Sequence, residues 1–160
     1  MATSRELQSD LDAVVRPREL AVSEALRIPD RNRALLAVHQ NLRRDSDRGS
    51  TVAWAYEAML KVNSSRVPSM FFEWSPAEVG RARKALSEVG APETVAAIDE
   101  VFEYVGVDPE LDELPDSAVD VLQSDAFEQW KRESLPTPLL LADKLFEQIL
   151  EYVQRHVHEL

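Results

Sequence analysis

The feature that most constrains this chain is a helical repeat of apolar residues that recurs along its length. Its clearest case lies over residues 138–157, where five apolar side chains return every four residues: Leu141, Leu145, Ile149, Val153 and Val157. This spacing places them on one face of an α-helix. Glycine occurs only 4 times, and the two-residue alternation typical of half-buried strands is weak. The sequence therefore predicts an all-α fold.

Capping signals predict where several helices begin and end. The stretch Ser75–Glu78 combines an N-cap serine, a proline at the first helical position and a glutamate that can complete a capping box. This helix is expected to stop at Gly90, and Pro92 starts the next one, which predicts an antiparallel helical hairpin. Further helices are expected over 5–15, 18–27, 51–61, 117–123 and 125–133, and another after the N-cap Asp30.

Two polar stretches predict interruptions. Eight polar or glycine residues over 43–50 predict a surface connection, and residues 63–69 predict a second break. We place a boundary in the first stretch, between an N-terminal helical arm (1–48) and a compact helical domain (49–160). With 160 residues, 44% of them apolar, the chain can bury a sizeable core as one compact unit.

Composition excludes several classes of protein. There is no cysteine, which excludes disulfides, cysteine zinc sites and thiol catalysis. The longest purely apolar run, residues 139–142, is far shorter than the ~20 residues that span a bilayer. The first residues show no secretory apolar region, so a cytoplasmic protein is expected. The net charge of -11 predicts repulsion from nucleic acids and anionic membranes.

The residues suited to catalysis are few. The chain has three histidines, His39, His156 and His158, and no nucleotide-binding, metalloprotease or serine-hydrolase motif. We therefore predict a non-enzymatic protein with no catalytic residue, no cofactor and no metal site. A small enzyme is a remaining hypothesis. It requires a pocket in which His39 meets a carboxylate of perturbed pKa.

Charge is distributed unevenly along the chain. Residues 1–66 carry 11 Lys or Arg and 9 Asp or Glu, whereas residues 67–160 carry 7 and 20. The stretch 99–130 holds eleven carboxylates and neither lysine nor arginine, and we call these eleven the acidic tract. Its members are Asp99, Glu100, Glu103, Asp108, Glu110, Asp112, Glu113, Asp116, Asp120, Asp125 and Glu128. Apolar residues interleave with them, which predicts a folded acidic region.

An acidic tract of this kind has two interpretations. Like charges at helical spacing destabilise a helix by tenths of a kcal/mol, so ordinary helices intersperse both signs. Carboxylates on adjacent turns lie ~5–6 Å apart and can imitate a row of DNA phosphates. The tract is then a docking face for a basic partner. The alternative is a solvated face that only keeps the protein soluble.

A set of motifs extends from about residue 50 to residue 158. It comprises an Asn-led loop, paired aromatics, a turn that closes one helix, a late Phe in the next and a closing helix: Asn63, Phe71-Phe72, Ala85–Ala91, Val101-Phe102 and Leu150–Val153. In these motifs the sequence resembles the domain family of bacterial DNA-mimic protein nineteen. Two motifs depart from the family pattern: Ser64-Ser65 stand where the family loop has Gly-Gly after the Asn, and Trp74-Ser75 stand where it has a second Asn after the aromatics.

The resemblance implies an all-helical domain and a homodimer. One member of the family occupies the DNA-binding surface of a helix-turn-helix transcription factor. The acidic residues are not part of the family motif. Our leading hypothesis is a non-enzymatic acidic interaction protein, in its sharpest form a DNA mimic. It would bind the basic surface of a DNA-binding protein, a transcription factor or a nuclease, and compete with DNA. The alternative is an immunity- or antitoxin-like inhibitor of a toxin or nuclease.

Overall fold

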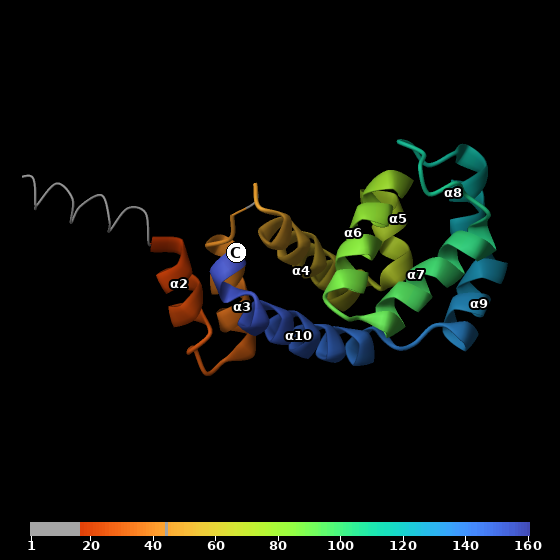
Figure 1. The fold of residues 1–160 in the computed structure, drawn as a ribbon. Helices are drawn as coiled ribbons and strands as arrows, with labels where there is room; N and C mark the ends of the chain where they lie inside the picture. The colour runs from red at the N-terminus through yellow and green to blue at the C-terminus, as the bar shows by residue number, and fades with distance from the viewer. Residues whose placement is uncertain (1–16, 44) are drawn as a thin grey trace, which may run out of the picture.

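A computed structural model describes residues 17–43 and 45–160, and all regular structure in those residues is helical (Figure 1). The all-α prediction is confirmed. The expected helix over 5–15 lies outside the described residues. The elements in chain order are α2 (Pro17–Ala25), α3 (Arg31–Gln40), α4 (Asp47–Ser65), η1 (Val67–Ser69), α5 (Met70–Glu73), α6 (Pro76–Glu88), α7 (Pro92–Val105), α8 (Asp116–Leu122), α9 (Asp125–Ser134), α10 (Pro138–Arg155) and η2 (Val157–Glu159).

The C-terminal helix α10 organises the bundle. It packs along α4 and also contacts α3 and α7. Helix α6 packs against α4 and α7 as well. Figure 1 shows α2 and α3 at one end of the molecule and α8 and α9 at the other, with α10 running between them. The short η2 segment after α10 returns to α2. Residues from both ends of the described chain therefore meet in one structure.

The core is continuous from α3 to α10. Side chains from five elements are almost fully buried in it: Leu35, Met59, Phe71, Ile98 and Leu145. The apolar repeat of the last helix supplies part of this core, because its first four members are buried on α10. The fifth, Val157, follows the end of α10 and is half-buried. No helix of the described residues is both long enough and apolar enough to cross a membrane.

The predicted helical hairpin of α6 and α7 is confirmed with its caps. The Ser75 hydroxyl accepts the backbone N–H of Glu78, and the Glu78 carboxylate accepts the backbone N–H of Ser75, both at 3.2 Å. Gly90 is left-handed, with φ of 82°, and the N–H of Ala91 donates to the carbonyl of Leu86. These bonds satisfy backbone groups at both ends of α6.

The surface connection predicted over 43–50 is shorter than expected. Helix α4 already begins at Asp47, because the Ser46 hydroxyl accepts the N–H of Gly49 at 3.0 Å. A Cβ on Gly49 would lie 1.9 Å from the carbonyl oxygen of Arg43. The glycine that suggested a loop thus permits a close backbone approach inside a helix. The predicted boundary at residue 48 falls in the first turn of α4, and α3 packs against α4 and α10.

The second predicted break begins later than expected. Helix α4 continues through residues 63–65, and the residue that follows its end is Arg66, whose backbone has φ of 81° and ψ of 161°. The polar residues there extend the helix instead of interrupting it. Pro68 follows in η1, where both it and Val67 are buried. The break is therefore a single sharp change of direction at Arg66.

Candidate functional site

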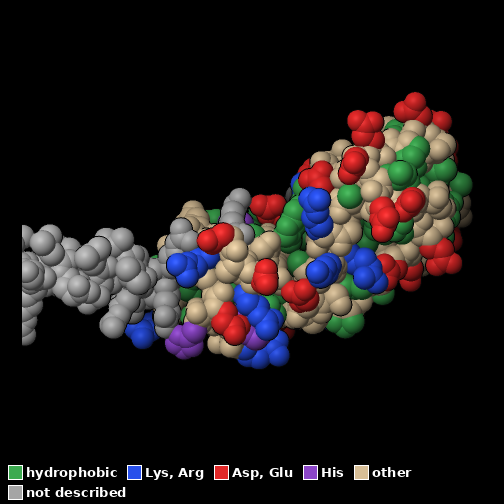
Figure 2. All heavy atoms as spheres, turned by 45° about the horizontal axis from the view of Figure 1, so that its top comes forward, with side chains coloured by type: hydrophobic (Ala, Val, Ile, Leu, Met, Phe, Trp, Pro, Cys, Tyr) green, Lys and Arg blue, Asp and Glu red, His purple; other side chains and the backbone are tan. Residues whose placement is uncertain are grey.

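The acidic tract covers one end of the molecule. Three of its residues lie on the second half of α7, four on the connection between α7 and α8, two on α8 and two on the start of α9. Ten of the eleven are exposed, and Glu128 is half-buried. Figure 2 shows acidic side chains gathered over the end of the molecule that holds α8. Separate stretches of sequence thus contribute to one acidic surface.

Two of the eleven carboxylates are neutralised by cations from outside the tract. Arg83 on α6 donates two hydrogen bonds, of 2.5 and 2.8 Å, to the Asp99 carboxylate. Glu128 accepts a 2.5 Å hydrogen bond from Lys131 and lies 3.6 Å from Arg132. The bond from Lys131 holds the pKa of the Glu128 carboxyl below its ordinary value. The other nine carboxylates make no ion pair with any residue of known placement.

The connection between α7 and α8 is held in place on α6. The N–H of Ala77 donates to the carbonyl of Leu111 at 3.0 Å. The carbonyl of Pro109 lies within van der Waals distance of the Cβ position of Gly80. Within the connection, the Asp108 carboxylate accepts the N–H of Glu110 at 2.9 Å. The acidic residues of this segment are therefore presented from a fixed backbone.

A groove crosses the acidic surface between α7 and α9. It has a volume of about 490 Å³ and is lined by Glu100, Glu103, Tyr104, Trp130 and Ser134. The Tyr104 and Trp130 rings stack with their centroids 4.5 Å apart. Both rings also contact the buried ring of Phe127, whose centroid lies 5.4 Å from that of Tyr104 and 5.6 Å from that of Trp130. The groove thus combines a supported aromatic pair with two carboxylates that carry no ion pair.

This combination of groups suits a cation. An aromatic face attracts Lys or Arg within ~6 Å of the ring centroid, and nearby carboxylates add Coulomb attraction. Tyr104 keeps 37% of its surface exposed, so one side of the aromatic pair stays accessible. We call this site the aromatic groove. It can take the side chain of a lysine or an arginine.

Sequence reasoning found the carboxylates of the groove and missed the groove itself. Glu100, Glu103 and Tyr104 have the i, i+3 and i+4 spacing that places them on one helix face, which was a usable signal. The contribution of Trp130 depends on how α9 folds back, which periodicity does not predict. Only the structure brings Trp130 to Tyr104.

The structure also places other residues that the sequence analysis singled out. Phe71 is buried and meets the Phe102 ring edge-on at 4.8 Å, but Phe72 is 52% exposed, so only one of the paired aromatics enters the core. His39 is half-buried and packs on the Tyr56 ring at 4.4 Å. His156 ends α10 and lies 2.8 Å from the Glu159 carboxylate.

Where residues are placed, no three histidine or carboxylate groups come together as metal ligands would. No family model matches the chain, no curated protein matches it, and no solved structure matches it. The resemblance to the DNA-mimic family therefore stays a prediction from the sequence.

Proposed function

We propose that this protein acts without catalysis, by binding a basic partner protein through the acidic surface and excluding DNA from that partner. The observation that carries the proposal is the set of nine exposed carboxylates without ion pairs, presented by α7, α8, α9 and the connection fixed on α6. Leaving so many like charges unpaired costs stability through self-repulsion. A binding role for the surface would explain why the protein keeps this destabilising arrangement of charges.

The aromatic groove strengthens the proposal. A face that serves only solubility requires charge, but it does not require a stacked Tyr–Trp pair beside the carboxylates. Aromatic and arginine side chains dominate the energetics of protein interfaces. We therefore expect one lysine or arginine of the partner to insert at Tyr104 and Trp130, while the surrounding carboxylates meet further cations.

The main test uses a variant in which four carboxylates of the α7–α8 connection become amides. The substitutions are Asp108→Asn, Glu110→Gln, Asp112→Asn and Glu113→Gln. A matched control removes four exposed carboxylates elsewhere that form no ion pair with a described residue: Glu24→Gln, Asp45→Asn, Glu147→Gln and Glu151→Gln. Both variants change the net charge from -11 to -7. Any difference between them therefore reports position and not total charge.

Partners are captured from lysate of the native host by the wild type and by both variants, at low and at high salt. We expect the wild type and the control to retain a basic DNA-binding protein or nuclease that added DNA displaces, and the four-residue variant to lose it. Salt should weaken this binding because it screens exposed charges. A captured transcription factor indicates a regulator, and a captured toxin or nuclease indicates an inhibitor. Equal capture by all three proteins would contradict the proposed surface.

A second test addresses the groove. Glu100→Gln with Glu103→Gln removes both groove carboxylates, and Glu147→Gln with Glu151→Gln is the control of equal charge on α10. We expect the groove variant to bind the captured partner at least tenfold more weakly than the control, because partner binding would bury these two carboxylates beside the partner's cation. Equal affinities would remove the groove from the interface and leave the rest of the surface.

A further inference from the structure

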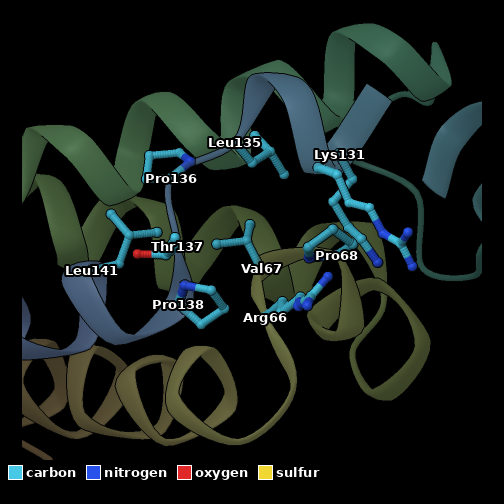
Figure 3. A pocket seen from close by; sticks show the side chains of 10 residues that line it. Arg66, Val67, Pro68, Lys131, Leu135, Pro136, Thr137, Pro138 and Leu141 are labelled. Carbon is cyan, nitrogen blue, oxygen red and sulfur yellow. The ribbon is translucent and has the colours of Figure 1, made fainter. Parts of the chain in front are cut away.

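A second hollow lies on the other side of α9 and has the opposite charge. It has a volume of about 150 Å³ and lies between Arg66 at the end of α4, the segment around Pro68, and the α9–α10 connection (Figure 3). Figure 3 shows Lys131 and Arg66 beside Pro68, with Thr137, Pro138 and Leu141 facing them across the hollow. We call it the basic pocket.

The wall of the basic pocket is largely apolar. Six of its ten lining residues are apolar: Val67, Pro68, Leu135, Pro136, Pro138 and Leu141. Three of these are prolines, whose rings fix the backbone φ angle. A site with a fixed backbone loses little conformational entropy when a ligand enters. The pocket is therefore preformed and suited to an apolar group.

Three cations surround the same pocket. Arg66, Lys131 and Arg132 all line it, and the one carboxylate that pairs with them is Glu128. These four groups together carry a net charge of +2. The surrounding part of the chain, residues 66–160, is strongly acidic. Arg66 makes no ion pair with any residue of the described part of the chain. The pocket therefore offers more positive charge than its own carboxylate neutralises.

The backbone at Arg66 supports a functional interpretation. Its φ of 81° and ψ of 161° lie in a region that is essentially confined to glycine. Such conformations persist only where the surrounding structure imposes them, and they concentrate at ligand sites. Here the conformation directs the chain from α4 into Val67 and Pro68, which form the pocket wall. The same turn thus supplies both a cation and part of the apolar surface.

We propose that the basic pocket binds a small organic acid, with one carboxylate attached to an apolar group about the size of a benzene ring. The carboxylate would meet Arg66, Lys131 and Arg132, and the apolar group would enter between the prolines. The size follows from the volume, because an apolar cavity of about 150 Å³ accommodates benzene. The sign of the ligand charge follows from the three cations. This site adjoins the acidic surface at Glu128 and takes a ligand of opposite charge.

The test is a titration of the isotope-labelled full chain with benzoate, followed by amide and side-chain NMR signals. Benzyl alcohol serves as the neutral comparison and acetate as the anion without an apolar ring. We expect benzoate to shift signals of Arg66, Lys131 and Leu135, and to bind at least about tenfold more tightly than either comparison. Equal binding of benzyl alcohol, or shifts confined to other residues, would overturn the proposal, as would no shift at the pocket.

Variants separate the pocket from general charge. Lys131→Met and Arg132→Gln should each weaken benzoate binding about tenfold, because each removes a charge-assisted hydrogen-bond donor. Lys84→Met and Arg81→Gln remove the same charges from exposed positions on α6 outside the pocket and should leave the affinity unchanged. If the pocket variants and the α6 variants lost benzoate affinity equally, the assignment of the pocket would be overturned. Thermal unfolding of each variant checks that the fold is retained.

Glu128→Gln gives a test of opposite sign. The Glu128 carboxylate competes with the ligand for Lys131 and Arg132. Its replacement by an amide should therefore tighten benzoate binding, although it removes an ion pair from the protein. A weaker or unchanged affinity would contradict the proposal that these cations serve a ligand. The result is independent of the acidic surface, because benzoate binding requires no partner protein.

Discussion

Arg66 is the residue with the least ordinary backbone in the described chain. It is the one non-glycine residue there with a positive φ, and its side chain is exposed. Glycine adopts this conformation without a Cβ clash. We expect Arg66→Gly to raise the free energy of unfolding by about 1 kcal/mol, measured by urea denaturation. Arg66→Ala keeps a Cβ and should give no such gain, so equal stabilities of the two variants would contradict the explanation.

Glu128 is the residue whose titration tests the local charge balance. Its pKa is lowered chiefly by the hydrogen bond from Lys131. A carboxyl with a lowered folded-state pKa stabilises the fold above the unfolded value of about 4.3, and this contribution is lost as pH falls through the folded value. Lys131→Met should raise the pKa of Glu128, measured by carbon NMR, and reduce the loss of stability in acid. An unchanged pKa would show that Lys131 is not its cause. Lys84→Met is the control of equal charge.

At the scale of the helix, two glycines should respond oppositely to alanine. Gly49 lies in the first turn of α4, where a Cβ would meet the Arg43 carbonyl oxygen at 1.9 Å, whereas at Gly80 in α6 the nearest atom is 3.7 Å away. We expect Gly49→Ala to destabilise the protein by about 1–3 kcal/mol and Gly80→Ala to stabilise it by about 0.5–1 kcal/mol. Thermal and urea unfolding measure both. A neutral Gly49→Ala would show that the backbone approach is not tight.

Sequence predicts helices well where their ends carry local signals. The Ser75–Glu78 box and Gly90 mark both ends of α6, and Asp30 caps α3, because these interactions involve only nearby residues. The start of α4 was misjudged for the opposite reason. Its glycine is explained by a contact with Arg43 in the preceding loop, which local composition does not express. The pocket around Arg66 and Pro136 depends on contacts still more distant in the chain.

Helix α9 separates two sites of opposite character. Trp130 and Ser134 line the aromatic groove, whereas Lys131 and Leu135 line the basic pocket. Neighbouring residues of one short helix therefore belong to different surfaces. A sequence window that averages charge over 125–134 conceals both sites. This is why the acidic tract could be recognised from the sequence, while the groove and the pocket required the fold.

At the scale of the whole molecule, the acidic surface should oppose folding. Nine carboxylates at one end make no ion pair with a described residue and repel one another, so the four-residue variant of the α7–α8 connection should unfold at a higher temperature than the wild type at low salt. The difference should shrink at about 1 M salt, where the Debye length falls to ~3 Å. Asp108→Asn keeps the oxygen that accepts the Glu110 N–H, so the connection should hold its conformation.

The control variant, with its four changes spread over α2, the α3–α4 connection and α10, should gain less stability. A four-residue variant that is less stable than the wild type would mean that these carboxylates make favourable contacts. Circular dichroism checks helix content, and calorimetry at several salt concentrations measures the difference.

The position of α10 has a consequence for synthesis. Helices α3, α4 and α7 are made early, yet each leaves part of its apolar face to be covered by α10. A nascent chain that has just emerged with α4 and α6 therefore exposes this surface until translation passes residue 155 and α10 leaves the ribosome. Folding should complete in one late step after that point. Slowing the ribosome before α10 would prolong the interval in which chaperones are needed.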